Sequence, residues 1–403
     1  MIADKESLGL AGDITFSGEI LPLEELRCLT DDVLNPGLLA SIRAQAVDTD
    51  PLYGIFTSGS TGVPKGVVVS HRSVIDFIGH FTELFHITQD DVIGNQAPFD
   101  FDVSVKDIYS ALSTGATLEI IPKRLFSIPS GLLDYLCHRK ITTAIWAVSA
   151  LCIITTLKGF TYRVPSHLNK ILFSGEVMPV KHLNTWRSYL PKALFVNLYG
   201  PTEITCNCTY YVVDRDFEPG TPIPIGKPFP NETVFLLDEN NRLVTEPGQC
   251  GELCVAGTAL ALGYYRDPER TAMAFVQNPL NTCYQETIYR TGDLACYGED
   301  GLLYFSSRKD FQIKHMGHRI ELGEIEAALE AVEGVDRAVC LFLEEKNKIA
   351  AFYEGTAGKR DIALGLEHLL PRYMFPNLYR NLPKLPLTKN SKVDRQALRR
   401  LYE

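Results

Sequence analysis

The feature that most constrains the fold is a series of short apolar runs that end in glycine or polar residues and precede helical patterns. Four such runs are Tyr53–Phe56, Thr143–Trp146, Lys170–Phe173 and Leu194–Asn197. Amphipathic stretches, among them Ser73–Leu84 and Val180–Leu190, lie between the runs. Because strands that alternate with helices are typical of parallel sheets, the sequence predicts an α/β protein with a parallel sheet flanked by helices.

The composition and the residue pattern of the sequence change twice farther along the chain. After Gly220, Pro and Gly are frequent, and the short runs Thr233–Leu237 and Glu252–Val255 predict a twisted β region. From Asp310 onward, residues 311–332 read FQIKHMGHRIELGEIEAALEAV, which predicts a strand, a turn and a helix. We therefore place a domain boundary near Asp310, between residues 1–309 and residues 310–403.

Composition narrows the classes of function. A chain of 403 residues with 45% hydrophobic content can bury a large core and form at least two folding units. The net charge of −10, with scattered acidic residues, argues against nucleic acid and favours small molecules or another protein as partners. The longest apolar stretches, such as Ile141–Leu157, are interrupted by Thr and Ser, and the opening residues do not resemble a secretory signal. We therefore expect no membrane partner and a cytoplasmic location.

The cysteines predict no zinc site. Cys206 and Cys208, and Cys250 and Cys254, are the only close pairs among ten cysteines, and neither pair is matched by a His/Cys pair at zinc spacing. Buried free thiols are the expected state.

A phosphate-binding loop is the clearest single motif. Residues 57–66, TSGSTGVPKG, contain four hydroxyls, three glycines and one lysine directly after a short strand. Glycines let backbone N–H groups converge on an anion, hydroxyls donate further hydrogen bonds, and the lysine adds a positive charge. Pro64 precedes Lys65, so the loop is not a Walker loop, which places glycine there. In isolation, a surface turn rich in small residues explains the same composition.

Further motifs resolve this ambiguity. They are Phe101–Ser104, Phe173–Glu176, Asn197–Glu203, Gly251–Leu253, Gly263–Tyr264, Tyr289–Asp293, Arg308–Asp310, Gly317–Glu326 and Ser391–Arg395. Together with TSGSTGVPKG, in this order, they resemble the signature motifs of the adenylate-forming (AMP-binding) superfamily from about residue 50 to the end. Within it, the chain resembles the adenylation domains of nonribosomal peptide synthetases and the D-alanine–carrier protein ligases.

The resemblance implies both a fold and a reaction. It implies a large N-terminal domain with a distorted β-barrel portion over about 220–309, followed by a small, mobile α+β catalytic lid. It also implies that ATP and an amino acid give an aminoacyl-adenylate and pyrophosphate. The aminoacyl group then passes to the phosphopantetheine thiol of a carrier protein.

The resemblance further assigns the residues that bind ATP and Mg²⁺. Lys65 and the loop hydroxyls are expected at the β- and γ-phosphates, Thr202 at the α-phosphate, the Tyr199 ring at adenine, and Glu203 at Mg²⁺, which prefers oxygen ligands. Asp293 and Arg308 are the expected ribose contacts. The full set of expected nucleotide-binding residues is Thr57, Ser58, Gly59, Ser60, Thr61, Gly62, Lys65, Glu176, Asn197, Tyr199, Gly200, Thr202, Asp293 and Arg308.

Three residues are expected to act on the reacting groups, and one to move the lid. By resemblance, Lys392 bridges the substrate carboxylate and the α-phosphate, assisted by Thr202 and Lys65. A solvated lysine is the alternative for Lys392 from its polar surroundings alone. Asp310 matches the hinge about which the lid swings, and Gly317 the segment that then faces the thiol tunnel.

The acyl pocket is expected to favour an amino acid. Phe101 matches the aromatic residue that closes the pocket, and Asp102 matches the carboxylate that pairs with the α-ammonium group. A capping role is the alternative for Asp102, and without it an acyl-CoA synthetase would be the expected class. The expected lining is Val103, Lys106, Ile145, Leu172, Ser174, Leu198, Cys206 and Asn207.

Lys106 does not by itself identify the substrate. Its ammonium group could pair with an acidic side chain of the substrate, pair with Asp107, or extend to solvent. The apolar remainder of the pocket slightly favours a structural role, and the Trp146 context resembles the D-alanine ligases, which take a small substrate.

The sequence departs from the family pattern in three places. Residues 1–50 match only the tail of the family's opening subdomain, so we expect that subdomain to be largely absent, in a fragment or a naturally short protein. Ser307 and Ser391 stand where glycine is usual. The truncation motivates a second hypothesis, a nucleotide-binding remnant without catalysis.

Overall fold

The computed structural model describes residues 2–4, 8, 18–26, 35–57, 64–218, 221–309, 312–386 and 393–402. The chain divides into two compact units, Met1–Asp50 and Pro51–Glu403. The first unit pairs β1 (Ile2–Ala3) with β2 (Leu21–Pro22) in parallel and adds α2 (Leu23–Leu26) and α3 (Pro36–Gln45). The domain boundary predicted at Asp310 falls outside the described residues and stays a prediction.

A seven-stranded mixed sheet forms the centre of the second unit. Its strand order is β11-β10-β9-β8-β7-β5-β6, and the strands from β6 to β9 are parallel, whereas β10 and β11 are antiparallel. The strands are β5 (Val92–Asn95), β6 (Thr117–Ile120), β7 (Thr143–Ala147), β8 (Lys170–Ser174), β9 (Leu194–Tyr199), β10 (Thr209–Val212) and β11 (Lys227–Pro228). Three of the four predicted apolar runs are therefore adjacent parallel strands, as expected.

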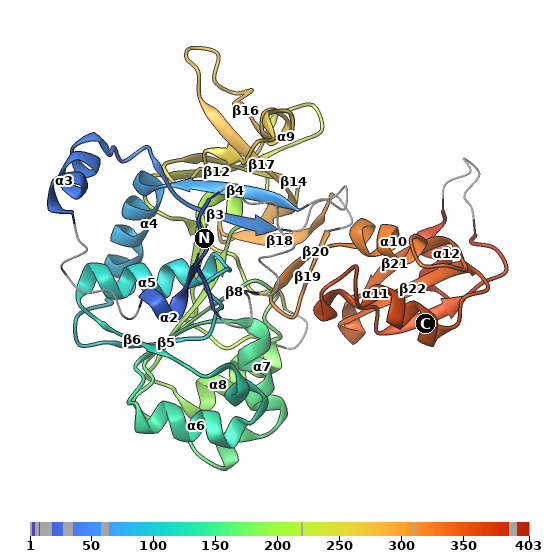
Figure 1. Cartoon of the computed structure of the whole chain (residues 1–403), viewed down its shortest axis with the longest axis horizontal. Coiled ribbons are helices and arrows are strands. Elements are labelled where there is room, and N and C mark those ends of the chain that lie inside the picture. Colours follow the sequence, from blue (N-terminus) through green and yellow to red (C-terminus); the bar gives the residue numbers. More distant parts are fainter. Residues whose placement is uncertain are drawn as a thin grey trace. The chain divides into compact units, whose positions relative to one another are not determined.

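Helices cover both faces of this sheet because its strands are apolar on both sides. Trp146 and Phe173 pack against α6, α7 and α8, whereas the alternate residues Ile145 and Leu172 pack with α4 and α5. Figure 1 shows α6, α7 and α8 grouped together, away from α4 and α5. The helices are α4 (His71–Leu84), α5 (Val103–Thr114), α6 (Pro129–His138), α7 (Val148–Thr156) and α8 (Val180–Tyr189), with 3₁₀ turns η2 (Lys123–Ser127) and η3 (Gly159–Thr161).

The first predicted run belongs to a different sheet. Tyr53–Phe56 lies in β3 (Pro51–Thr57), which pairs antiparallel with β4 (Lys65–Ser70), and β15 (Gly263–Tyr264) completes a three-stranded sheet. The prediction of a parallel strand was wrong here. Only residues 58–64 connect β3 to β4, and a parallel pair needs a crossover of a dozen residues or more.

The predicted twisted β region is an antiparallel sheet of six strands, the curled half-barrel of the fold. It contains β12 (Glu232–Leu237), β13 (Leu243–Val244), β14 (Cys250–Gly257), β16 (Phe275–Gln277), β17 (Thr287–Tyr297) and β18 (Leu303–Arg308). The helix α9 (Pro268–Ala274) precedes β16. Asp293 and Arg308 are directly opposite each other in the pairing of β17 with β18.

The C-terminal segment is α+β, as predicted. It opens with a hairpin of β19 (Gln312–His315) and β20 (His318–Glu321), whose turn residues Met316 and Gly317 both have positive φ, as a two-residue hairpin turn of type I′ requires. The sequence predicted one strand and a turn before the helix, so β20 is an addition. The other elements are α10 (Leu322–Glu330), β21 (Val335–Leu343), η5 (Glu344–Lys346), β22 (Lys348–Gly355), α11 (Lys359–Leu366), η6 (Arg372–Met374), β23 (Leu378–Asn381) and α12 (Arg395–Arg399).

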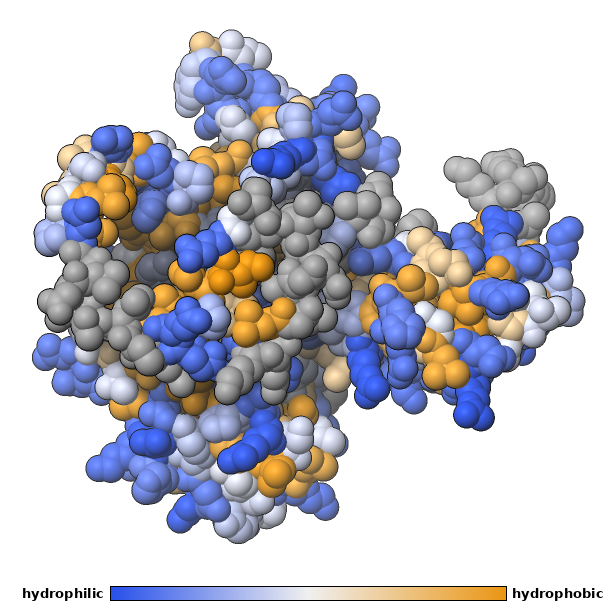
Figure 2. All heavy atoms as spheres, in the orientation of Figure 1, coloured by the Kyte–Doolittle hydropathy of each residue, from blue (hydrophilic) through white to orange (hydrophobic). Residues whose placement is uncertain are grey.

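The lengths and hydropathies of the described helices show whether any of them could span a membrane. In the part of the chain that the structure describes, no helix is both long enough and apolar enough to cross a membrane. On the face drawn in Figure 2, hydrophilic side chains cover most of the region of α6, with apolar side chains scattered among them.

Candidate active site

A buried carboxylate, Glu203, joins two cations from distant parts of the sequence. Glu203 lies in the 3₁₀ turn η4 (Thr202–Ile204), and its side chain has no solvent exposure. Its Oε1 atom lies 2.8 Å from Nζ of Lys65, and its Oε2 atom accepts a hydrogen bond from Nη1 of Arg319 at 2.7 Å. The Tyr264 hydroxyl donates to Oε1 at 2.9 Å.

The Glu203 cluster contains different numbers of positive and negative groups. Burial by itself would raise the pKa of the Glu203 carboxyl, but Arg319 and Lys65 hold it well below its usual value of 4.5, so the group is ionised. One carboxylate therefore faces two cations. The excess positive charge makes this the natural place for a polyanion to bind.

The ends of β3 and β4 bring the phosphate-loop motif to the same place. Thr57 is the last residue of β3 and lies opposite Lys65, the first residue of β4. Oγ1 of Thr57 is buried and has no hydrogen-bond partner among the described residues, so it is available to a phosphate oxygen. Ser58, Gly59, Ser60, Thr61 and Gly62 lie outside the described residues, and their role stays a prediction.

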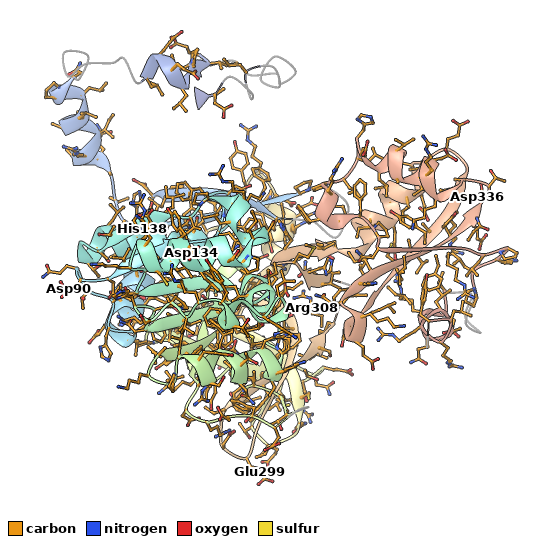
Figure 3. All side chains as sticks on the ribbon, turned by 90° about the horizontal axis from the view of Figure 1, so that it is seen from below. Asp90, Asp134, His138, Glu299, Arg308 and Asp336 are labelled. Atoms are coloured by element: carbon orange, nitrogen blue, oxygen red, sulfur yellow. The ribbon has the colours of Figure 1, made fainter. Side chains whose placement is uncertain are left out.

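A second polar cluster surrounds Asp293. The Tyr199 hydroxyl at the end of β9 donates to Oδ2 of Asp293, and the Arg308 guanidinium donates to Oδ1. Figure 3 labels Arg308 near the middle of the view and Glu299 at the lower end of the same part of the chain. The structure thus unites the two expected ribose contacts and the expected adenine contact.

The loop after β9 is tightly fixed. The Asn197 amide donates to the Pro224 carbonyl at 2.8 Å, which indicates a structural role for this expected nucleotide-binding residue. A Cβ atom on Gly200 would lie 2.5 Å from Cα of Asn207, so only glycine fits there. Thr202 follows in η4 and is nearly buried.

The hairpin of β19 and β20 contacts two other expected site residues. The Gly317 N–H donates to the Glu176 carboxylate, whose pKa burial raises. The His318 ring meets the Phe101 ring edge-on at 4.9 Å and stacks on Tyr373 at 3.6 Å. Glu176 therefore binds the chain itself here, rather than standing free for a nucleotide.

The expected acyl-pocket residues come from adjacent strands of the parallel sheet and from the segments that follow or face their carboxyl ends. Ile145, Leu172 and Leu198 come from β7, β8 and β9 and share one apolar cluster with Cys206. Ser174 ends β8, and Val103 begins α5. This edge of a parallel sheet is where α/β proteins usually bind ligands.

Two charged residues begin α5. Asp102 occupies the N-cap position, but its side chain makes no capping hydrogen bond, so the capping explanation does not apply. Lys106 is fully buried, and its Nζ donates to Oδ1 of Asn207 at 2.7 Å. Among the described residues Lys106 forms no ion pair with Asp107, whose carboxylate instead accepts from Asn95. Neither structural alternative for Lys106, the Asp107 pair or the solvent-exposed ammonium, is present.

The remaining expectations have mixed outcomes. Lys392 and Asp310 lie outside the described residues, so their roles stay predictions. Cys206, Cys208, Cys254 and Cys340 are buried free thiols as expected, whereas Cys250 and Cys283 are exposed. No cluster of three or more His, Cys, Asp or Glu side chains in the described ranges is arranged to hold a metal ion.

Sequence reasoning missed three side chains of the site. Arg319 and Tyr264 both bind Glu203, and the Lys314 ammonium lies over the Tyr199 ring at 5.4 Å. Tyr264 and Arg319 lie inside motifs that the sequence singled out, Gly263–Tyr264 and Gly317–Glu326. The charge of Arg319 and the hydroxyl of Tyr264, inside these motifs, could have marked both residues as candidates for the site.

Known proteins share these features. Residues 13–265 match the family of AMP-binding enzymes. Tyrocidine synthase 1 of Brevibacillus parabrevis is 34% identical in an alignment that covers 99% of this chain and 35% of that protein. The L-proline–[L-prolyl-carrier protein] ligase of Streptomyces coelicolor is 36% identical over 374 residues, 91% of this chain and 66% of the ligase. The chain thus spans only part of the length of these relatives.

The fold also matches solved structures. The Vibrio cholerae adenylation domain AlmE, in complex with glycyl-adenosine-5′-phosphate, superposes with a TM-score of 0.84 at 24% sequence identity, over all of this chain and 79% of AlmE. This likeness confirms the predicted fold class. The family match over residues 13–265 and the curated relatives show the family: the chain belongs to the adenylate-forming family of AMP-binding enzymes, with the adenylation domains of peptide synthetases and amino acid–carrier protein ligases among its relatives.

Proposed function

We propose that this chain uses ATP to activate an amino acid as an aminoacyl-adenylate, releases pyrophosphate, and transfers the aminoacyl group to the thiol of a carrier-bound phosphopantetheine. The observation that carries the proposal is the ion-pair cluster in which Glu203 joins Lys65 and Arg319 at 2.8 and 2.7 Å beside the phosphate-loop motif.

The chemistry requires positive charge at this place. A carboxylate must attack an α-phosphorus surrounded by negative oxygens, so catalysis consists mainly of positioning and cationic stabilisation. Lys65 and Thr57, which are opposite each other at the ends of β3 and β4, would bind the outer phosphates, and Thr202, next to Glu203 in the chain, would bind the α-phosphate. Lys392, from the polar C-terminal loop, would neutralise the attacking carboxylate.

The Asp293 cluster supports nucleoside binding. Its two carboxylate oxygens, held by Tyr199 and Arg308, are acceptors of the kind that a pair of ribose hydroxyls needs. Because Asp293 faces Arg308 directly across a strand pair, its position is fixed before the nucleotide arrives.

Mg²⁺ fits the donor set at Glu203. The carboxylate is ionised and offers two oxygen atoms, which are the ligands that this cation prefers. Bound there with ATP, the cation would neutralise phosphate charge. Lys65 and Arg319, which contact the same carboxylate, would add positive charge beside the phosphates.

Asp102 supports an amino substrate. Asp102 is partly buried, its carbonyl contacts Cys206 of the apolar cluster, and its side chain makes no capping hydrogen bond. A carboxylate in such a place is favourable when a cation pairs with it, and the α-ammonium group supplies one. An acyl-CoA synthetase has no use for this charge. A carrier protein as acceptor fits the resemblance to the prolyl-carrier protein ligase.

Amino-acid-dependent exchange of labelled pyrophosphate into ATP, measured with Mg²⁺ across the twenty amino acids and D-alanine, tests the proposal. We expect exchange with a small set of amino acids, its loss in Glu203→Ala, and its retention in Glu299→Ala, which changes an exposed acid of the same type. Exchange with fatty acids alone would indicate an acyl-CoA synthetase. The absence of exchange with every acid would indicate a nucleotide-binding protein that does not catalyse adenylation.

A further inference from the structure

Lys106 is a buried lysine that forms no ion pair with any of the residues that the structure describes. The side chain has no solvent exposure and is among the largest fully buried side chains of the protein. It lies on α5, three residues after the first helical residue, beside the apolar cluster that contains Ile145, Leu172 and Leu198. A buried ammonium group normally has a carboxylate partner, because leaving a charge unpaired in an apolar environment is costly.

The nearby acidic residues are engaged elsewhere. Oδ2 of Asp107 accepts the Asn95 amide at 2.7 Å, and Oδ1 is buried without a partner among the described residues. Burial raises the pKa of Asp107 to about 7, so this carboxyl is partly protonated at neutral pH and is a weak counter-charge. Asp102, in the proposed function, pairs with the α-ammonium group of the substrate.

The hydrogen bonds of Lys106 are also incomplete. An ammonium group has three N–H donors. In the described residues only one acceptor is found, Oδ1 of Asn207 at 2.7 Å. Burial lowers the pKa of Lys106 despite the charges of Asp102 and Asp107, which indicates that the charged form is under-compensated. A ligand carboxylate would supply both the missing charge and the missing acceptors.

The charges of an acidic amino acid match this site one by one. Its α-ammonium group pairs with Asp102, and its α-carboxylate enters the reaction with ATP. Its side-chain carboxylate then remains for Lys106. A neutral substrate would leave Lys106 unpaired. We propose, on the basis of the proposed function, that Lys106, held by Asn207, selects an amino acid whose side chain carries a carboxylate.

Binding of non-hydrolysable aminoacyl-sulfamoyl adenosines by calorimetry tests this inference independently of turnover. Aspartyl, asparaginyl and leucyl analogues form one set of similar shape, and glutamyl, glutaminyl and methionyl analogues form a second. We expect the acidic member of one set to bind the wild-type chain about ten- to hundredfold more tightly than its amide, the range given by a hydrogen bond to a charged group.

Lys106→Met should abolish that preference and leave the apolar member of the set bound at least as tightly as before. Lys192→Met, at an exposed lysine, is the matched control and should keep the wild-type profile. If Lys106→Met does not fold, the wild-type profile alone still decides.

Three outcomes would overturn the inference. Wild-type binding of an amide or apolar analogue as tightly as either acid would overturn it while leaving the proposed amino-acid activation intact. An acidic preference that survives in folded Lys106→Met would also overturn it. Failure of every analogue to bind would remove the proposed function together with this inference.

Discussion

Replacement of Glu203 by glutamine removes one buried negative charge and keeps the shape of the side chain. Lys65 and Arg319 then lose the carboxylate that both contact, in a site where both are largely buried. At 2.8 Å, two unit charges in a medium of effective dielectric constant ~20 attract by about 6 kcal/mol. The desolvation of both ions offsets part of this attraction, so breaking such a pair from one side costs about 3–5 kcal/mol.

A double-mutant cycle isolates the interaction. Lys65→Met added to Glu203→Gln removes one of the two cations that lose this carboxylate, so the double variant should be more stable than the sum of the two single losses predicts. We expect a coupling energy of at least about 1 kcal/mol, within the range found for contacting residues. The paired controls are Lys192→Met and Glu299→Gln, both at exposed positions, which should change stability little.

Urea unfolding followed by tryptophan fluorescence is a suitable assay. The chain has two tryptophans, Trp146 and Trp186, and both are buried in the core of the seven-stranded sheet, so their emission reports the unfolding of this part. Circular dichroism recorded in parallel checks that the transition is a single one, because chains of this size often unfold in several steps.

The pH dependence supplies an independent check. Because the pKa of Glu203 is depressed in the folded state, its contribution is present above the unfolded value of 4.5 and is lost as pH falls. The difference between wild type and Glu203→Gln should therefore shrink in acid. Additive losses in the cycle, or a difference that grows in acid, would refute the reasoning.

Three further predictions concern single side chains. Lys392→Ala should lower the rate of adenylation by on the order of 10²–10³ and leave ATP binding nearly unchanged; undiminished exchange would rule out its assigned role. Asp102→Ala should raise KM for the amino acid sharply and hardly change KM for ATP, and an equal change in both would count against an ammonium contact. Burial raises the pKa of Glu232 to about 8, so the folded state binds a proton that the unfolded state has lost, and stability falls as pH rises from 4.5 through 8. Glu232→Gln should remove this fall and be more stable than wild type at pH 9 but not at pH 5 in urea unfolding; equal pH profiles would contradict this.

The parallel sheet was predictable because its strands are local apolar runs. Helices separate Thr143–Trp146 from Lys170–Phe173 and Lys170–Phe173 from Leu194–Asn197, and such crossovers favour parallel neighbours. The run at Tyr53–Phe56 is also short and apolar, yet the eight residues between it and the next run at Lys65 are too few for a helical crossover. Attention to the length of this connection, and to the second apolar run from Lys65 to Ser70, would have predicted the hairpin.

The candidate site was only partly predictable because its contacts join distant positions. Lys65, Glu203, Asp293 and Arg308 were identified by their motifs, but Arg319 lies 116 residues from its partner Glu203. The contacts of Lys106 depend on Asn207, which is 101 residues away, and on the hydrogen bond between Asp107 and Asn95. No local pattern reveals which neighbour a charged side chain will meet after the chain folds.

The close approach of Gly200 to Asn207 has a consequence for attempts to redesign this protein. The two backbones leave no room for even a methyl group, so any insertion or deletion between Thr202 and Cys208 would displace Tyr199 and, through its hydroxyl, Asp293. Transplanting this loop from a relative with another substrate would disturb the two clusters together. Libraries that exchange side chains at positions 145 and 172 avoid this coupling, because these residues stand on β7 and β8 rather than on the shared loop. An exchange at position 106 does not, because Lys106 donates to Asn207 of that loop.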